Sequence, residues 1–350
     1  MPTLSDVALR AGVSAATVSR AFNRPERINS ETRKRILDAA EKLQYVPLQS
    51  RLRPRNLRDG AHPASTVGFH YFRSTPTDSL QSNPFYSRVL IGALEEASRL
   101  GIHLVFSSSD CNSTNPDPAL TALVERAPDA MILVHAAQED LIRAFAANVQ
   151  RCVLVDNKDT RGVCDSVVTD NIGGAVAAMQ HLLALGHRRI VYVTTSPADP
   201  SFEERLIGYL HACYGQGIDI DPQLIVCGDN RDFPFEPLRA CLLRPSRPTA
   251  VFAASDDHVL SVYHICNALG LRIPEDISVI GFDDMLYCTQ MIPPLTTIHV
   301  NAELMGCAAV RRLFEETAPF VDGGQPIHGV RLVLPTHLVE RGSCLPVKPA

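Results

Sequence analysis

The sequence predicts an all-α helix-turn-helix head joined to an α/β body that is built in two lobes. Two short amphipathic segments broken by Gly12 stand at the N-terminus. From Thr66 onward, apolar runs of strand length alternate with helical segments. A chain of 350 residues with 45% hydrophobic and 20% charged residues is long and apolar enough for two or three folded domains.

The first helix of the head is expected from Leu4, with Thr3 as its cap. Thr3 and Asp6 have the spacing of a capping box, and Gly12 supplies a stop. The apolar positions that recur at helical spacing are Leu4, Val7, Ala8 and Ala11.

The second helix is expected to begin at Ser14, an N-cap residue. Val18 and Phe22 face inward at i, i+4. The exposed face carries small side chains and one arginine: Ala15, Ala16, Ser19, Arg20 and Asn23. Such a face fits the DNA major groove, where Arg20 can bond a guanine and Ala16 can touch a thymine methyl. The alternative is a solvated helical hairpin without a nucleic-acid partner.

Charge separates these two alternatives. Residues 1–60 carry 12 lysines and arginines against 6 aspartates and glutamates, whereas the remaining residues carry 21 against 32. Because DNA binding needs positive potential concentrated on one part of the chain, a basic head on an acidic body favours the DNA-binding interpretation.

A third helix over Ser30–Leu43, capped by Ser30 or Asn29, completes the head. Residues 44–65 are basic, rich in proline and glycine, and too poor in apolar residues for a core, which predicts a linker.

The body alternates strands and helices, the pattern of parallel sheets covered on both faces. Strands are expected at Thr66–Phe72, Ile102–Ser107, Ala130–His135, Cys152–Asp156, Arg189–Thr194, Leu224–Gly228, Ala250–Ala254 and Ile277–Phe282. Helices are expected near 85–100, 138–148, 173–186, 203–216, 235–243 and 256–270. Ligands of such folds bind at the carboxyl ends of the strands.

Composition argues against several other classes of protein. No run of 18 apolar residues and no signal peptide is present, so we expect a cytoplasmic protein without a membrane partner. The ten cysteines form no C-x-x-C pair, which favours buried thiols over a metal site. Phosphate-binding glycine loops and nucleophile elbows are absent, so no catalytic residue and no cofactor is expected.

Two acidic pairs follow apolar strands, Asp256-Asp257 and Asp283-Asp284. Each pair could cap the following helix or accept hydrogen bonds from a ligand. The sequence leaves both roles open.

A set of motifs resembles, in the same order, the LacI/GalR (lac repressor) family of bacterial transcription regulators. The motifs are Thr3–Ala8, Ala11–Asn23, Glu31–Arg33, Tyr45–Pro47, Asn83–Tyr86, Asp170–Asn171, Leu185–Ile190, Arg205–Tyr209, Pro248–Phe252, Pro274–Asp284 and Pro293–Thr297. The resemblance covers essentially Thr3 to Cys344.

This resemblance implies a homodimer whose two heads bind an inverted-repeat operator in double-stranded DNA. It also implies a body like periplasmic sugar-binding proteins, which holds a small-molecule effector, most readily a sugar or sugar derivative, between its lobes. Residues 1–46 would form the DNA-binding domain, 47–65 the linker or hinge, and 66–345 the effector-binding and dimerisation domain. Lobe 1 would comprise 66–169 and 297–332, lobe 2 would comprise 170–296 and 333–345, and the chain would cross near Asp170, Thr297 and Val333.

The resemblance also assigns roles to residues. DNA contacts are expected from Thr3, Ser14, Ala15, Ala16, Thr17, Ser19, Arg20, Asn23, Asn29 and Leu57. Effector contacts are expected from Phe85, Tyr86, Arg205, Asn230, Ser255 and Asp283. Core aromatics, a surface ion pair and a helix cap are the purely structural alternatives for Phe85, Tyr86, Arg205 and Asp283.

Three positions depart from the family pattern. Ser255 stands where asparagine is common, and Asn230 stands where many members place an aromatic residue. In the linker, Pro54-Arg-Asn-Leu57 is the best match for the helix whose leucine enters the minor groove, reached after about three extra residues. An ordinary flexible linker is the alternative.

Three classes of function are therefore compared. An effector-gated, DNA-binding transcription regulator, acting as a repressor, accounts for both the head and the body. The basic head argues against a pure solute-binding protein, and the missing phosphate-binding glycine pattern argues against a regulator fused to a sugar kinase.

Overall fold

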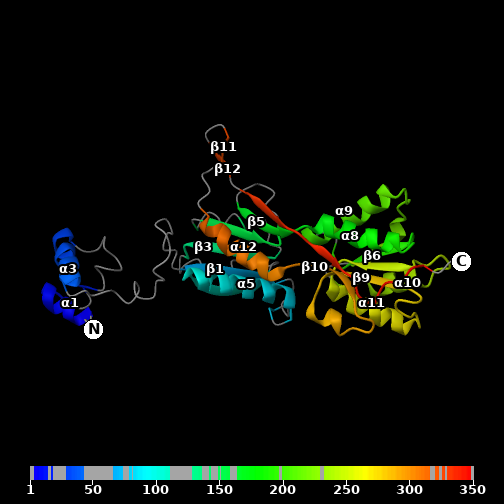
Figure 1. Ribbon diagram of the computed structural model, residues 1–350, viewed down its shortest axis with the longest axis horizontal. Helices are drawn as coiled ribbons and strands as arrows, with labels where there is room; N and C mark the ends of the chain where they lie inside the picture. Colours follow the sequence, from blue (N-terminus) through cyan, green and yellow to red (C-terminus); the bar gives the residue numbers. More distant parts are fainter. Residues whose placement is uncertain are drawn as a thin grey trace. The chain divides into compact units, whose positions relative to one another are not determined.

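The computed structural model divides into two units, Met1–His62 and Pro63–Ala350, each described here by itself (Figure 1). The residues described are 4–14, 17–18, 29–42, 66–73, 79–80, 82–110, 128–135, 142, 149, 151–157, 164–196, 199–228, 232–315, 320–322, 325–327 and 329–347.

The first unit contains α1 (Leu4–Ala11) and α3 (Ser30–Lys42). Its small core is apolar, as the helical spacing predicts: Val7, Ala8, Ala11, Val18, Ile36, Ala39 and Ala40. Gly12 has a φ of +65°, a left-handed conformation suited to the end of a helix. Ser14 Oγ accepts from the backbone N–H of Thr17 at 3.1 Å, which is the expected N-cap contact. Of the second helix only Thr17 and Val18 are among the described residues.

The first lobe of the second unit is built on one six-stranded sheet in the order β13-β5-β4-β3-β1-β2. Its strands are β1 (Thr66–Arg73), β2 (His103–Asp110), β3 (Ala130–Val134), β4 (Arg151–Val155), β5 (Asp165–Thr169) and β13 (Arg331–Leu334). All neighbouring strands are parallel. Helices α5 (Pro84–Leu100) and α12 (Ala302–Phe314) pack on each other and against this sheet.

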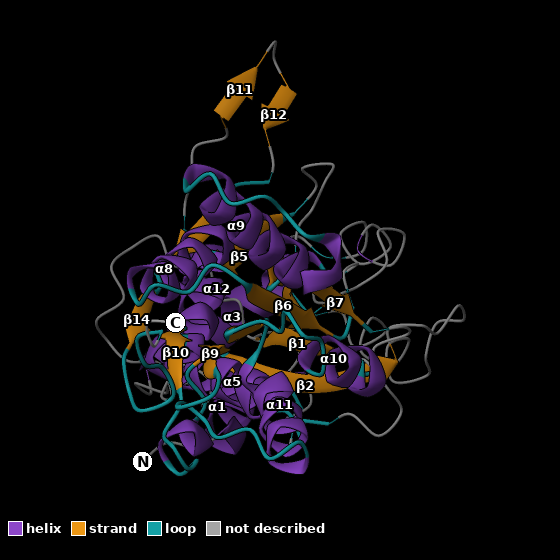
Figure 2. Cartoon of the chain, turned by 90° about the vertical axis from the view of Figure 1, so that its right-hand side faces the viewer, coloured by secondary structure: helices purple, strands orange, loops and turns teal. Residues whose placement is uncertain are grey.

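The second lobe repeats the arrangement with the order β14-β10-β9-β8-β6-β7. Its strands are β6 (Ile190–Thr194), β7 (Ile225–Cys227), β8 (Ala250–Ala253), β9 (Ser278–Asp283), β10 (Thr296–His299) and the antiparallel β14 (His337–Val339). Helices α8 (Asn171–Ala184) and α9 (Pro200–Gly215) cover one face, and α10 (Phe235–Leu242) and α11 (Asp256–Ala268) cover the other (Figure 2). Short elements complete the body: η2 (Pro222–Leu224), η3 (Leu286–Thr289), β11 (Phe320–Asp322) and β12 (Gln325–Ile327).

The chain passes between the lobes at three places, each close to the expected residue. The first lies at Asp170, between β5 and α8, as expected. The second follows His299 rather than Thr297, because β10 still pairs with β9 of the second sheet. The third follows Leu334 rather than Val333, because β13 runs to Leu334 alongside β5 of the first sheet. Strand partners, which sequence periodicity does not reveal, set these boundaries.

The strands expected from the alternating pattern are all present, with ends shifted by a few residues. Six strands and one helix are not among the expected elements: β5, β10, β11, β12, β13, β14 and α12. The helix expected over 138–148 lies outside the described residues apart from the buried Ile142. Cys213, Cys241, Cys266 and Cys288 are buried thiols, and burial raises the pKa of each. Within the described part of the chain, no helix is long and apolar enough to cross a membrane.

Candidate functional site

A polar cavity of about 220 Å³ lies between the two lobes, at the carboxyl ends of their strands. First-lobe residues in its wall are Asn83, Phe85, Tyr86, His135 and Asp156. Second-lobe residues are Thr195, Ser196, Asp199, Ser201, Phe202, Arg205, Ser255, Asp257 and Asp283. This is the position at which open parallel sheets bind ligands.

Two helices bring their first turns to the cavity from matching positions in the two lobes. Helix α5 follows β1 and begins with Pro84, and the side chain of Asn83 accepts from its N-terminal turn. Helix α9 follows β6 and begins with Pro200, and Asp199 Oδ1 accepts from the Ser201 N–H at 3.0 Å. Proline at the first helical position with a polar cap before it fixes where each helix starts.

The first-lobe wall is held by a network around the Tyr86 hydroxyl. This hydroxyl donates to Asp156 Oδ2 at 2.7 Å and lies 2.5 Å from His135 Nδ1. Burial, reinforced by the nearby Asp156 carboxylate, raises the pKa of Tyr86 well above its usual value. The phenol is therefore a neutral donor. Phe85 packs edge-on against the Tyr86 ring with centroids 5.2 Å apart.

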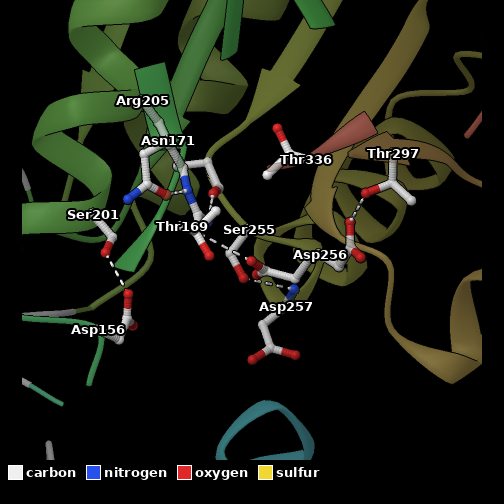
Figure 3. A network of polar contacts seen from close by, with 12 residues as sticks. Asp156, Thr169, Asn171, Ser201, Arg205, Ser255, Asp256, Asp257, Thr297 and Thr336 are labelled. Atoms are coloured by element: carbon white, nitrogen blue, oxygen red, sulfur yellow. Dashed lines mark hydrogen bonds and ion pairs between the residues drawn. The ribbon is translucent and has the colours of Figure 1, made fainter. Parts of the chain in front are cut away.

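The second-lobe wall is organised by Arg205, which is only 3% exposed. Its Nε donates to Asn171 Oδ1 at 2.9 Å, and one terminal nitrogen donates to the Ala254 carbonyl at 2.5 Å (Figure 3). The other terminal nitrogen lies 3.1 Å from Asp283 Oδ1, and the guanidinium stacks 3.8 Å from the Phe282 ring centroid. Arg205 is thus a buried cation held by two hydrogen bonds and an ion pair, rather than part of a surface ion pair.

Asp283 is buried, and one of its carboxylate oxygens lacks a hydrogen-bond donor within the described residues. The residue is 7% exposed and has a φ of +114°, which is uncommon for a residue other than glycine. Its Oδ1 is close enough to Arg205 for charge attraction, but it makes no aligned hydrogen bond within the described part of the structure. Burial raises the pKa of Asp283, and Arg205 opposes that rise. A ligand donor would complete the coordination of this oxygen.

Neither acidic pair caps a helix. Ser255 caps α11, and its Oγ accepts from the Asp257 N–H at 3.3 Å. Asp256 is fully buried and accepts from structural groups, the Met285 N–H at 2.9 Å and the Thr297 hydroxyl at 2.7 Å. Of the two roles left open, capping is therefore wrong at this pair, because the serine one residue earlier caps the helix.

The two residues of the second acidic pair, Asp283 and Asp284, also have different contacts. Asp283 faces the cavity, whereas Asp284 accepts from His299 Nδ1 at 2.8 Å and from Arg341 at 2.6 Å. Helix η3, which follows, has no side-chain cap. Only Asp257 and Asp283 are left to face a ligand.

Hydrogen bonds join the lobes beside the cavity. Ser201 Oγ of the second lobe donates to Asp156 Oδ1 of the first at 2.7 Å (Figure 3). Arg331 of β13 donates to Glu204 Oε1 of α9 at 2.6 Å, and Asn171 donates to the other oxygen of Glu204 at 3.1 Å. Because Asn171 also holds Arg205, the link between the lobes is continuous with the cavity wall.

The structure brings together five of the six residues expected at this site, namely Phe85, Tyr86, Arg205, Ser255 and Asp283. Asn230 lies outside the described residues. Asp257, from an acidic pair for which the sequence leaves ligand contact open, also lies in the wall. Eight further lining residues are not singled out as effector contacts by the sequence: Asn83, His135, Asp156, Thr195, Ser196, Asp199, Ser201 and Phe202. Most of these directly follow a strand or stand at the start of α5 or α9, and that position is the signal that could have found them.

Only three of the residues expected to contact DNA are among those that the structure describes. Ser14, Thr17 and Asn29 are described, and Ser14 and Asn29 are exposed. Thr3, Ala15, Ala16, Ser19, Arg20, Asn23 and Leu57 lie outside the described residues, so their contacts stay predictions.

Comparison with known proteins places the chain in a family. Residues 3–48 match the bacterial regulatory proteins of the lacI family, and residues 179–344 match the periplasmic binding protein-like domain. The ribose operon repressor of Escherichia coli is 30% identical over 98% of this chain and 100% of its own length. The regulator CelR of Thermobifida fusca is 30% identical over 98% of each chain. A solved complex of CelR with cellobiose has a TM-score of 0.67 at 30% identity, covering 98% of this chain and 100% of that one. The chain therefore belongs to the lacI family of bacterial regulatory proteins.

Proposed function

We propose that this protein is a sequence-specific transcriptional repressor whose affinity for operator DNA is controlled by a small sugar or sugar derivative bound between the lobes. The observation that carries the proposal is the cavity itself. It joins a buried arginine–aspartate pair to hydroxyl and aromatic side chains, in a chain that also carries a lacI-type head. Few precisely placed polar groups and aromatic faces are typical of small-molecule sites. Relatives named for ribose and crystallised with cellobiose support a carbohydrate effector.

The DNA-binding role is assigned to residues 1–46, and residues 47–65 connect them to the body at 66–345. Arg20 bonds a guanine in the major groove, and Leu57 inserts into the minor groove at the operator centre. Two copies of the chain read the two halves of an inverted repeat, because a two-fold dimer matches a two-fold site. The protein acts in the cytoplasm, where its DNA is.

The regulatory step is a shift between lobe arrangements. A ligand changes the operator affinity only if it binds one arrangement better than the other. The bonds from Ser201 to Asp156 and from Arg331 to Glu204 join the lobes and would have to break if they separate. The ligand therefore acts by stabilising or replacing these hydrogen bonds between the lobes. It is released chemically unaltered, because the family members are regulators rather than enzymes.

The DNA-binding part is tested by selecting binding sites from a random DNA library with the full-length protein. We expect an inverted repeat to be enriched, and Arg20→Ala to lower affinity by about 1–3 kcal/mol while relaxing preference at one base pair of each half-site. Lys34→Ala, which removes one exposed positive charge from α3, is the control and should leave the preferred sequence unchanged. Selection of no sequence, or an unchanged preference in Arg20→Ala, would contradict the assignment.

A further inference from the structure

The cavity between the lobes has an excess of negative charge. Among the described lining residues there are four carboxylates, those of Asp156, Asp199, Asp257 and Asp283, and one guanidinium, that of Arg205. His135 is the other titratable nitrogen base in the wall, and it is bonded to Tyr86. A site of this composition attracts cations and repels anions.

The single arginine is already held by other groups of the second lobe. Its Nε and both terminal nitrogens already face Asn171, the Ala254 carbonyl and Asp283. Moving it to a phosphate would cost the hydrogen bonds to Asn171 and Ala254 or the charge attraction to Asp283, all among buried groups. Among the residues of the wall that the structure describes, there is no second guanidinium and no lysine side chain for a sugar phosphate.

The four carboxylates differ in how many hydrogen bonds they already accept. Asp156 accepts from two hydroxyls, Asp199 caps α9, and Asp257 accepts from the Tyr287 hydroxyl at 2.5 Å. Asp283 is more than nine-tenths buried, and its Oδ1 makes no hydrogen bond within the described residues although it lies at the cavity. This oxygen can accept a hydrogen bond from a ligand, and a positively charged donor would bind it most strongly.

We propose that the cavity selects a polyhydroxylated ligand carrying a protonated amine, the chemistry of an amino sugar, over its neutral parent and over anionic derivatives. This inference rests on the proposed function and specifies its effector. An ammonium group supplies donors and positive charge to Asp283 and Asp257. Hydroxyl groups of the same ligand meet Ser201, Thr195 and Asn83, and the aromatic faces of Phe85 and Phe202 cover its apolar side. Discrimination arises largely from repulsion, because an anion would enter beside four carboxylates.

The test compares matched ligands on the full-length protein at pH 7 and constant ionic strength. Glucosamine, galactosamine and mannosamine are each compared with the parent hexose and with its 6-phosphate, by thermal shift and by calorimetry. At least one amine should bind at least about tenfold more tightly than its parent, and the phosphates should not bind. Equal shifts for every amine and its parent, including no shift for either, would overturn the inference.

Variants separate the charge effect from loss of structure. Asp257→Asn, at an exposed position in the first turn of α11, should reduce the preference for the amine severalfold while the protein stays folded. Asp283→Asn should reduce it further, and circular dichroism checks that this buried variant is folded. Asp219→Asn removes one exposed charge of the same lobe outside the cavity and should leave the preference unchanged. An unchanged preference in Asp257→Asn and in folded Asp283→Asn would contradict the inference.

Operator binding distinguishes this inference from the function on which it rests. If a neutral hexose binds as tightly as its amine and changes operator affinity, the amine preference is wrong and the proposed function stands. If an amine binds preferentially and leaves operator affinity unchanged, the cavity chemistry is right and the proposed regulatory function is wrong.

Discussion

The two lobes share one strand order, yet they bring opposite chemistry to the cavity between them. The fourth strand of each lobe in chain order leads to an aspartate with positive φ: Asp156, at +55°, directly follows β4, and Asp283, at +114°, is the last residue of β9. In each lobe the helix after the first strand begins with a proline and delivers the partner of that aspartate. Asp156 is held by neutral hydroxyls, whereas Asp283 faces the charged Arg205. Topology thus decides where side chains converge, and residue identity decides what the converged site can bind.

The largest effect is expected from Arg205→Ala. Removal of the guanidinium leaves Asp283, Asn171 and the Ala254 carbonyl without their buried partner, so the free energy of unfolding should fall by about 3–5 kcal/mol. Urea denaturation of the wild type and variant measures this difference. A decrease in the free energy of unfolding of less than about 1 kcal/mol would show that Arg205 and Asp283 are not the charged centre of the second lobe. The contrast drawn between the two lobes would then be wrong.

A second prediction concerns His258, which packs against Phe202 beside Arg205. Burial, and to a lesser degree Arg205, lower its pKa to about 3. Since the unfolded state binds the proton first, stability should fall as the pH drops from about 6.5 toward 3, by on the order of a few kcal/mol.

His258→Phe should flatten this acid dependence, because it removes the group that titrates. Nδ1 has no hydrogen-bond partner within the described part of the chain, so its loss breaks no hydrogen bond there. His187, whose pKa burial also lowers, provides the matched control as His187→Phe. That variant should lose stability at pH 7, because His187 bonds Thr249 at 2.8 Å and Ser278 at 3.0 Å. An identical pH profile in wild type and His258→Phe would refute the explanation.

The smallest effect is expected from Tyr86→Phe in the first lobe. The change deletes the hydroxyl shared by Asp156 and His135 but no charge, so the free energy of unfolding should fall by about 1–2 kcal/mol. Asp156 keeps its bond from Ser201. Tyr71→Phe, on the neighbouring buried ring, serves as the control for loss of a phenol in this core. A cost equal to that of Arg205→Ala would show that the two walls are not chemically different.

Much of the fold could be predicted because most strands of the body are strongly apolar. β3 and β8 are buried along their whole length and read as uninterrupted apolar runs. By contrast, β5 begins with Asp165-Ser166, and β10 carries two threonines that are buried by pairing within the sheet. Local periodicity does not detect strands whose burial depends on neighbours distant in the chain.

The residues of the site were predictable only in part. Arg205 and Asp283 stand in motifs that resemble the family pattern, so the resemblance identified them. Asp156 and His135 follow their strands without such a motif, and only the fold brings them beside Tyr86. The engagement of Arg205 on three sides was also invisible, because its partners lie on α8, after β8 and on β9.

The central claim is that the cavity and the DNA-binding head are energetically linked. The most direct measurement is the dissociation constant of one cavity ligand, the amino hexose or hexose with the largest thermal shift, for the free protein and for the protein saturated with its selected operator. Linkage predicts that the two constants differ by at least about fivefold, and that the ligand changes operator affinity by the same factor. Equal dissociation constants in the two states would contradict the account.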